Sequence, residues 1–338
     1  MFNVIDAYAR RNNLIYGICG GEDLDMEFLG DVCDIPFFRG ETYDRISPGR
    51  FLDNAKSVIV IGAEIESNSL IQGLSQVMAV SLSGADYHRT LNGLAQGLVL
   101  EMAEYEEFNF KIQVDSGPLM EAAFALKAGL GFQGKNKSII SEKFGAFFNI
   151  GLIVTDMEIE KNGNKDAEDF HKASESFRKC TENCRLCVKA CPTHAIDIEG
   201  NFNYKKCISY LTQKKGVLSL CEMESMGISI YGCDSCRNVC PYNSGRFNNK
   251  KDSAEKSEIL LKILSMSKSE FEKTFADSNF FWRGKTTIAR NCLIGLYNLK
   301  GKDSEAIIEK YRGSSNEVLR TTAEKLIEMA GGIYNGQV

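Results

Sequence analysis

Nine of the 12 cysteines in this 338-residue chain fall within one segment, and their spacing is typical of metal–sulfur ligands. The ending C-x2-C-x3-C-P occurs twice in the segment, once at Pro192 and once at Pro241. Bacterial ferredoxins with two [4Fe–4S] clusters carry this ending, and in them the cysteine before the proline ligates the other cluster. The segment therefore predicts two [4Fe–4S] centres.

The crossing rule assigns eight cysteines to the two clusters. One centre takes Cys180, Cys184, Cys187 and Cys240, and the other takes Cys191, Cys207, Cys233 and Cys236. Cys180 and Cys184 are separated by one residue more than the usual C-x2-C spacing. The alternative is a pair of zinc sites, but zinc does not account for two C-x3-C-P endings. The remaining cysteines are expected to be ordinary buried thiols: Cys19, Cys33, Cys221 and Cys292.

Asp115 lies where a predicted strand ends and a predicted helix begins, which is a frequent position for catalytic groups. From position alone, a helix N-cap is the favoured interpretation of this aspartate. His88 precedes another predicted helix and is interpreted as a structural residue. Neither side chain identifies a reaction by itself.

The residues from Gly129 to Gly134 match the letters G-x-G-x-x-G. They follow a helix, which excludes the dinucleotide fingerprint, and Lys135 is followed by Asn136, which excludes a P-loop. Three glycines in six residues still predict that the backbone closely approaches another group, and a flat cofactor is our hypothesis.

Periodicity predicts a mixed domain that positions these groups, followed by two further parts. We expect residues 1–165 to form an α/β or α+β domain, residues 171–250 the cysteine domain and residues 251–338 a helical tail resembling α-solenoid repeats. In the first part we expect strands Lys56–Ala63, Lys111–Val114 and Phe147–Val154, and helices Phe2–Asn13, Leu91–Phe108 and Leu119–Ala128.

Composition indicates a folded chain, since 43% of residues are hydrophobic and 25% are charged. No apolar run is long enough to span a membrane and the N-terminus does not resemble a secretory signal, so we expect a cytoplasmic protein. The net charge of −5 combines an acidic first half with a basic second half. The basic half either offsets the negative charge of thiolate-bound clusters or binds a polyanion such as RNA.

Motifs along nearly the whole chain resemble the epoxyqueuosine reductase family. They are RISP at 45–48, VDSGPL at 114–119, AGLGFQGKN at 128–136, CPT at 191–193, CISYLT at 207–212, YGCD at 231–234, WRGK at 282–285 and RN at 290–291.

The resemblance implies a cobalamin-dependent oxidoreductase that reduces epoxyqueuosine to queuosine at the wobble position of tRNA. It implies an α+β fold, with a nitroreductase-like cobalamin-binding domain, a ferredoxin-like double-cluster domain and a HEAT-like helical tail. The expected partners are a tRNA anticodon stem-loop and a low-potential donor such as ferredoxin or flavodoxin, with no membrane and a monomeric state. Two alternatives are kept: a related corrinoid reductase of a small epoxide, a halide or a corrinoid protein, and a plain electron-transfer ferredoxin.

The resemblance also implies roles for individual residues. Asp115 matches the proton donor, for which we expect a raised pKa. The cobalamin contacts would be Arg45, Ala79, Asp115, Lys135, Asn136, Ile150, Ser209, Asp234 and Ser235. The tRNA phosphate contacts would be Arg283, Lys285 and Arg290.

Overall fold

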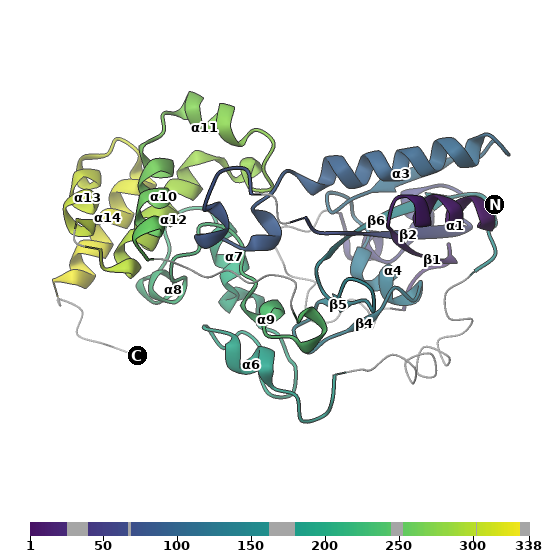
Figure 1. Cartoon of the computed structure of the whole chain (residues 1–338), viewed down its shortest axis with the longest axis horizontal. Coiled ribbons are helices and arrows are strands. Elements are labelled where there is room, and N and C mark those ends of the chain that lie inside the picture. The colour runs from purple at the N-terminus through teal and green to yellow at the C-terminus, as the bar shows by residue number, and fades with distance from the viewer. Residues whose placement is uncertain (26–39, 67–68, 162–179, 245–252, 302, 332–338) are drawn as a thin grey trace.

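The computed structural model describes residues 1–25, 40–66, 69–161, 180–244, 253–301 and 303–331 (Figure 1). A sheet with its covering helices lies at one end, and a group of helices lies at the other. The helices α6 and α9 of the cysteine segment lie between these ends. The boundary predicted between residues 165 and 171 falls outside the described residues.

The sheet has four strands in the order β1-β2-β6-β3, and every neighbouring pair is antiparallel. An antiparallel sheet with helices packed on it belongs to the α+β class, so the mixed helix and strand prediction is confirmed at that level. The strands are β1 (Ile15–Gly20), β2 (Ser57–Glu64), β3 (Phe110–Gln113) and β6 (Phe148–Thr155), with a separate hairpin of β4 (Phe132–Gln133) and β5 (Ile139–Ile140).

Strand β1 was not predicted, because Gly17 and Gly20 interrupt its apolar pattern. The structure explains Gly17: a Cβ there would lie 2.0 Å from the carbonyl oxygen of Ala128. The residue therefore lets the end of helix α4 (Glu121–Lys127) pack on the strand.

Side chains of β2 alternate between two cores, as the pleat requires. Val58 and Val60 face the core that contains Phe124 of α4. Ile59 and Ile61 face the opposite core, under helices α1 (Phe2–Arg11) and α3 (Tyr87–Ala103). The sheet is thus covered on both faces, with α4 on one side and α1 and α3 on the other.

Two helix starts differ from the predicted ones. Helix α3 begins four residues earlier than expected, because the carboxylate of Asp86 caps it by accepting from the backbone N–H of His88. Helix α4 begins at Glu121, two residues later than the predicted start at Leu119.

The C-terminal part is helical, as predicted, but its core is shared. Leu74 and Val77, from the predicted first domain, and Leu211 and Met223, from the cysteine domain, pack in one core with Phe271 and its neighbours. The boundary predicted at residue 250 therefore does not separate two cores. The helices of this part are α10 (Ser253–Ser265), α11 (Lys268–Phe275), α12 (Gly284–Leu299), α13 (Ser304–Lys310) and α14 (Glu317–Ala330).

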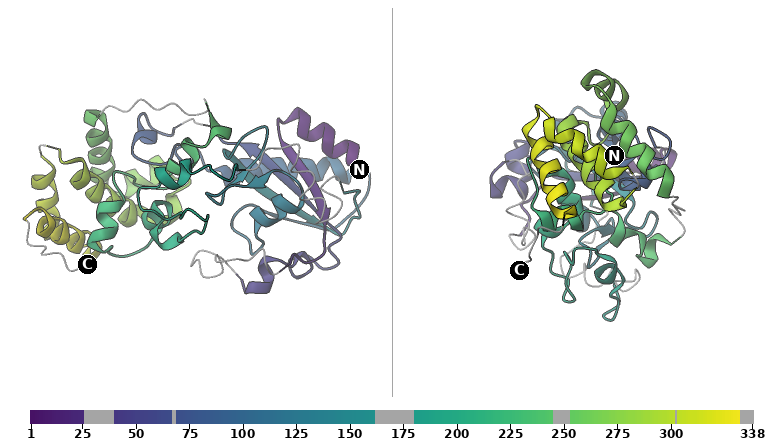
Figure 2. Two further views of the ribbon diagram at one scale, coloured as in Figure 1. Left: turned by 90° about the horizontal axis from the view of Figure 1, so that it is seen from below. Right: turned by 90° about the vertical axis from the view of Figure 1, so that its left-hand side faces the viewer.

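Short helices carry the cysteine segment, most of which lies between the sheet and the helical end in the left view of Figure 2. They are α6 (Leu186–Ala190), α7 (Ile208–Gln213), α8 (Leu220–Ser225) and α9 (Ser235–Asn238). Cys19 and Cys292 are buried as predicted, Cys221 is exposed, which corrects the prediction, and Cys33 lies outside the described residues. Within the described residues, no helix has the length and apolar character needed to cross a membrane.

Candidate active site and cluster sites

The first set of cysteines converges on one cavity of about 350 Å³. Burial and then the neighbouring thiols raise the pKa of the Cys187 and Cys240 thiols. A cluster relieves this cost, because its iron binds the thiolate form. The cavity is lined by all four members of the set: Cys180, Cys184, Cys187 and Cys240.

The second set also comes together from distant positions. Burial raises the pKa of the Cys207 thiol, and so do the nearby Cys233 and Cys191. Burial likewise raises the pKa of Cys236 to about 12, with Cys233 and Cys207 adding to the shift. The two groups are those expected from the crossing rule, and an all-thiolate donor set fits [4Fe–4S] clusters.

Within the described residues, no group of three or more His, Cys, Asp or Glu side chains has the geometry to hold a single metal ion. The cysteines of a [4Fe–4S] cube each bind a different iron, so they stand farther apart than the ligands of one ion.

Lys135 hydrogen bonds to the loop that contains the extra residue between Cys180 and Cys184. Its ammonium donates to the backbone carbonyls of Thr181, Glu182 and Cys184 at 3.1, 2.9 and 3.0 Å. The side chain predicted to contact cobalamin is therefore bound to the first cluster loop.

Asp115 lies in a loop with unusual backbone geometry. Its φ is +56°, in the left-handed region that few residues other than glycine adopt. Its backbone N–H donates to Oε1 of Glu121 at 2.5 Å, and Glu121 also accepts from the Gln113 amide. Helix α4 has Met120 at its N-cap with no side-chain cap. The N-cap interpretation of Asp115 is therefore wrong, and its carboxylate is left for other partners.

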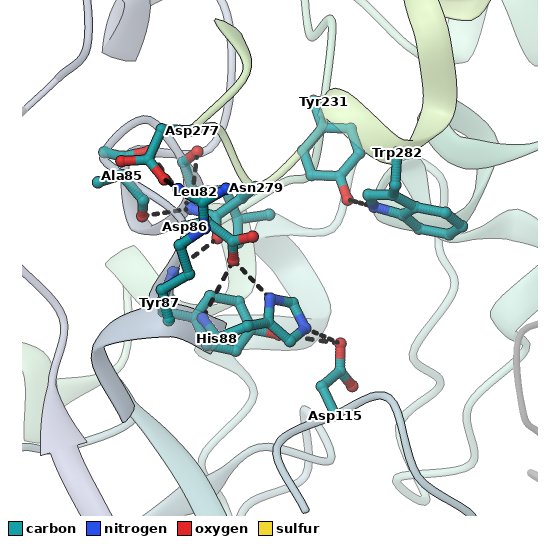
Figure 3. A network of polar contacts seen from close by, with 12 residues as sticks. Leu82, Ala85, Asp86, Tyr87, His88, Asp115, Tyr231, Asp277, Asn279 and Trp282 are labelled. Carbon is teal, nitrogen blue, oxygen red and sulfur yellow. Dashed lines mark hydrogen bonds and ion pairs between the residues drawn. The ribbon is translucent and has the colours of Figure 1, made fainter. Parts of the chain in front are cut away.

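Those partners come from the start of α3 (Figure 3). Oδ2 of Asp115 accepts from the Tyr87 hydroxyl at 2.9 Å and lies 3.4 Å from Nε2 of His88. Nδ1 of His88 lies 2.5 Å from Oδ1 of Asp86. The hydrogen bond from His88 lowers the pKa of Asp115, so the expectation of a raised pKa is wrong.

Asn279, in the segment between α11 and α12, fixes the start of α3. Its side-chain oxygen accepts from the Tyr87 backbone N–H at 3.2 Å, and its NH₂ donates to the carbonyls of Leu82 and Ala85 at 3.3 and 3.2 Å. The backbone N–H of Asp86 donates to the carbonyl of Asp277 at 2.8 Å. The helical end therefore positions the residues that contact Asp115.

Comparison with known proteins identifies the family. The model for a 4Fe-4S double cluster binding domain matches residues 179–243. An epoxyqueuosine reductase of Lactococcus garvieae is 32% identical over 289 residues, covering 81% of this chain and 78% of the relative. The chain belongs to the epoxyqueuosine reductase family.

Solved structures agree with this assignment. The epoxyqueuosine reductase of Streptococcus thermophilus matches with a TM-score of 0.81 and 26% identity, covering 100% of this chain and 95% of that one. A second epoxyqueuosine reductase structure, which holds an epoxyqueuosine-modified stem loop of tRNA-Tyr, has the same fold with a TM-score of 0.81 and 24% identity, covering 100% and 94%.

Membership makes the chain an oxidoreductase that reduces epoxyqueuosine, with cobalamin and two [4Fe–4S] clusters as its cofactors. The comparisons do not favour the alternative of a corrinoid reductase with another substrate.

Three of the predicted cobalamin contacts of the reductase line one cavity of about 450 Å³ beside Cys233: Ala79, Asp234 and Ser235. The carboxylate of Asp234 accepts from the backbone N–H and hydroxyl of Ser81 at 3.0 and 2.8 Å. These contacts join the segment around Ala79 to the second cluster loop.

The other predicted cobalamin contacts are placed separately. The carbonyl of the buried Arg45 accepts from the backbone N–H of Met120, and the Asn136 amide donates to the carbonyl of Cys236 at 3.4 Å. Ile150 lies on β6 and Ser209 on α7.

The glycine run of the reductase contains the close backbone approach that was predicted. A Cβ at Gly131 would lie 2.1 Å from the carbonyl oxygen of Ile140, so this glycine allows β4 and β5 to approach each other. Gly131 therefore has a packing role, and the contact of the run with a flat cofactor stays a prediction.

The predicted phosphate contacts fall into two groups. Arg290 is fully buried, and its guanidinium donates to the carbonyls of Lys214 and Gly216 at 2.6 Å each, so the prediction of a phosphate contact is wrong for this residue. Arg283 and Lys285 line an open cavity of about 650 Å³ together with Lys268. Arg283 is itself buried, and its guanidinium donates to the carbonyl of Gln213.

Sequence reasoning missed Trp282, which is 56% exposed. Its indole N–H donates to the Tyr231 hydroxyl at 3.0 Å, and the Arg283 guanidinium lies 4.1 Å from its ring centroid. The signal was present, since this is the only tryptophan of the chain and it stands beside two basic residues.

Proposed function

We propose that this reductase acts on epoxyqueuosine at the wobble position of a tRNA anticodon stem-loop, and that Asp115 protonates the epoxide oxygen. The observation that carries the proposal is the position of the Asp115 carboxylate, which is 65% exposed yet held by Tyr87 and His88. An oxygen that leaves carbon needs a proton, and a positioned acid supplies it.

Cobalamin supplies the electron pair when it is bound, and the two clusters deliver electrons to it. We place it against Ala79, Asp234 and Ser235, because their cavity lies beside Cys233 of the second cluster set. Arg45, Asn136, Ile150 and Ser209 remain proposed contacts. Asp234 holds the two walls of this cavity together through Ser81.

The chain divides by function into three parts in this proposal. Residues 1–165 form a nitroreductase-like catalytic domain, residues 171–250 a ferredoxin-like double-cluster domain and residues 251–338 a HEAT-like domain that contacts tRNA. We further propose a cytoplasmic monomer that receives electrons from a low-potential ferredoxin or flavodoxin.

The tRNA surface is proposed to run past Trp282 to the cavity lined by Lys268, Arg283 and Lys285. Exposed aromatic rings stack on unpaired bases, and basic side chains bind phosphates. Tyr231 lies between this surface and the proposed active site. Its hydroxyl accepts the hydrogen bond from the Trp282 indole, and burial and then the Asp115 charge raise the pKa of that hydroxyl.

The test is conversion of epoxyqueuosine to queuosine. Cluster-loaded protein with cobalamin and a chemical reductant is incubated with tRNA carrying epoxyqueuosine, and nucleosides are measured by mass spectrometry. Queuosine formation supports the proposal. Consumption of a small epoxide or halide by protein that leaves the tRNA unchanged would overturn it.

A further inference from the structure

Three side chains form a line of hydrogen-bonding groups that ends at Asp115 (Figure 3). Asp86 lies 2.5 Å from Nδ1 of His88, and the opposite ring nitrogen, Nε2, lies 3.4 Å from Oδ2 of Asp115. The two ring nitrogens of a histidine can pass a proton from one side to the other. His88 and Asp86 are 30% and 28% exposed, so the line reaches toward solvent.

The reaction needs more protons than Asp115 can hold. Conversion of an epoxide to an alkene breaks both carbon–oxygen bonds, forms the carbon–carbon double bond and releases the oxygen as water. The balance is epoxide plus two electrons plus two protons giving alkene plus water. The electrons come through the cofactors of the established activity. A single carboxyl group carries one proton, so a second proton must reach the site during each turnover.

We propose that His88 supplies protons to Asp115, and that Asp86 keeps the imidazole charged and oriented for this transfer. The inference rests on the proposed role of Asp115. In each transfer the bond from Nε2 of His88 to its proton breaks and a bond from that proton to Oδ2 of Asp115 forms. The neutral imidazole then regains a proton from solvent. His88 is thus a positioning residue that acts through Asp115.

The electrostatics place the resting proton of this line on His88. Partial burial disfavours the imidazolium, yet the hydrogen bonds to Asp115 and Asp86 raise the pKa of His88 to about 9. The same hydrogen bond lowers the pKa of Asp115. At neutral pH the resting site therefore holds its proton on His88, and Asp115 must receive one before it can donate.

Other charged or titratable groups around His88 do not take its place. The Tyr87 ring stacks on the His88 imidazole, with 4.2 Å between the ring centroids. Burial and then the Asp115 charge raise the pKa of the Tyr87 hydroxyl. The Arg89 guanidinium pairs with Asp277 at 2.8 Å.

Two further titratable groups, Glu121 and Tyr231, feel the charge of Asp115. Glu121 bonds the backbone N–H of Asp115, and its pKa is raised to about 7 by burial and by the Asp115 charge. Tyr231 hydrogen bonds Trp282, and burial raises its pKa to about 12.

A titration measures the charge on His88 without turnover. The chain has three histidines, so their imidazole signals can be followed by NMR in the holoenzyme with oxidised clusters, and His88→Gln assigns the signal that disappears. We expect the assigned ring to titrate near pH 9 and to shift to lower pH in Asp86→Asn and in Asp115→Asn. Titration near the ordinary histidine value of about 6.5 would overturn the proposal.

Kinetics then test the transfer. The wild-type kcat should fall as pH rises through about 9, because the imidazolium is lost there. Asp86→Asn should move that fall to lower pH, and His88→Gln should abolish it while lowering kcat on the order of 10²-fold with KM for tRNA unchanged. Arg89→Gln, which removes a neighbouring charge, should keep the wild-type profile.

The outcomes separate this proposal from the one it rests on. A His88→Gln enzyme with the wild-type kcat and pH profile overturns the role of His88 and leaves Asp115 as the donor. An Asp115→Asn enzyme with the wild-type rate overturns both roles.

Discussion

The side-chain oxygen of Asn279 accepts a hydrogen bond from the backbone N–H of Tyr87 at 3.2 Å, across 192 positions of sequence. Tyr87 in turn donates its hydroxyl to Asp115 at 2.9 Å. The helical end of the molecule is therefore joined to Asp115, the proposed proton donor, through two hydrogen bonds.

Asn279→Ala should lower kcat and stability together. It leaves the carbonyls of Leu82 and Ala85 without their donor, which costs about 1–3 kcal/mol of unfolding free energy. The matched control is Asn298→Ala, which removes two similar bonds to the carbonyls of Met223 and Gly227 away from Asp115. The free energy of unfolding and kcat are measured for both variants by chemical denaturation and by activity assay. An equal fractional loss of kcat in the two variants would contradict the account.

Lys135→Gln should weaken the first cluster and spare the second. Gln cannot reach and bridge the three carbonyls that the ammonium binds at Thr181, Glu182 and Cys184. We expect about half of the iron to be lost on gel filtration, with one cluster signal left in the EPR spectrum of reduced protein. Lys137→Gln, at an exposed position two residues on, is the control. Equal iron in both variants would refute the role of Lys135.

Arg290 and Lys285 should behave in opposite ways. Arg290→Ala removes a buried guanidinium from the carbonyls of Lys214 and Gly216, which should cost about 3 kcal/mol of stability. Lys285→Ala should leave the melting temperature nearly unchanged, weaken tRNA binding and reduce its salt dependence. Binding titrations at several salt concentrations and thermal melts distinguish the two. Salt-independent binding by wild-type protein would remove the basis for a phosphate contact.

Glu121→Gln should change how stability depends on pH. Burial, and then the Asp115 charge, raise the pKa of Glu121 to about 7, from 4.5. Stability that is present below pH 4.5 is therefore lost as pH rises through about 7, by up to about 3 kcal/mol. Gln has no charge to bury, so the variant should lose less stability between pH 5 and pH 8. The control is Glu101→Gln, at the exposed partner of Arg11, and identical pH slopes in all three proteins would contradict the account.

The sequence was most informative where spacing alone carries chemistry. The two C-x3-C-P endings predicted which cysteines come together, and the cavity around Cys180 and Cys240 contains its expected set. Strand β2 and helix α1 were predicted from their apolar periodicity. These features depend on neighbours along the chain, so one sequence is enough to reveal them.

The parts that depend on distant contacts were not predictable. His88 looks like a lone structural histidine until Asp115, 27 residues later, is placed beside it. The expected rise in the pKa of Asp115 failed for the same reason, because the hydrogen bond from His88 lowers it. Arg290 was assigned to a phosphate because its burial cannot be read from its neighbours.

The most direct test of the central claim is the rate at which an Asp115→Asn enzyme converts epoxyqueuosine in tRNA, measured by nucleoside mass spectrometry in a single turnover. The amide is close in size to the carboxyl group but has no acidic proton to give near neutral pH. The account predicts a loss of ~10²–10⁴-fold in rate, with clusters, cobalamin and tRNA binding retained. Conversion at the wild-type rate would contradict it.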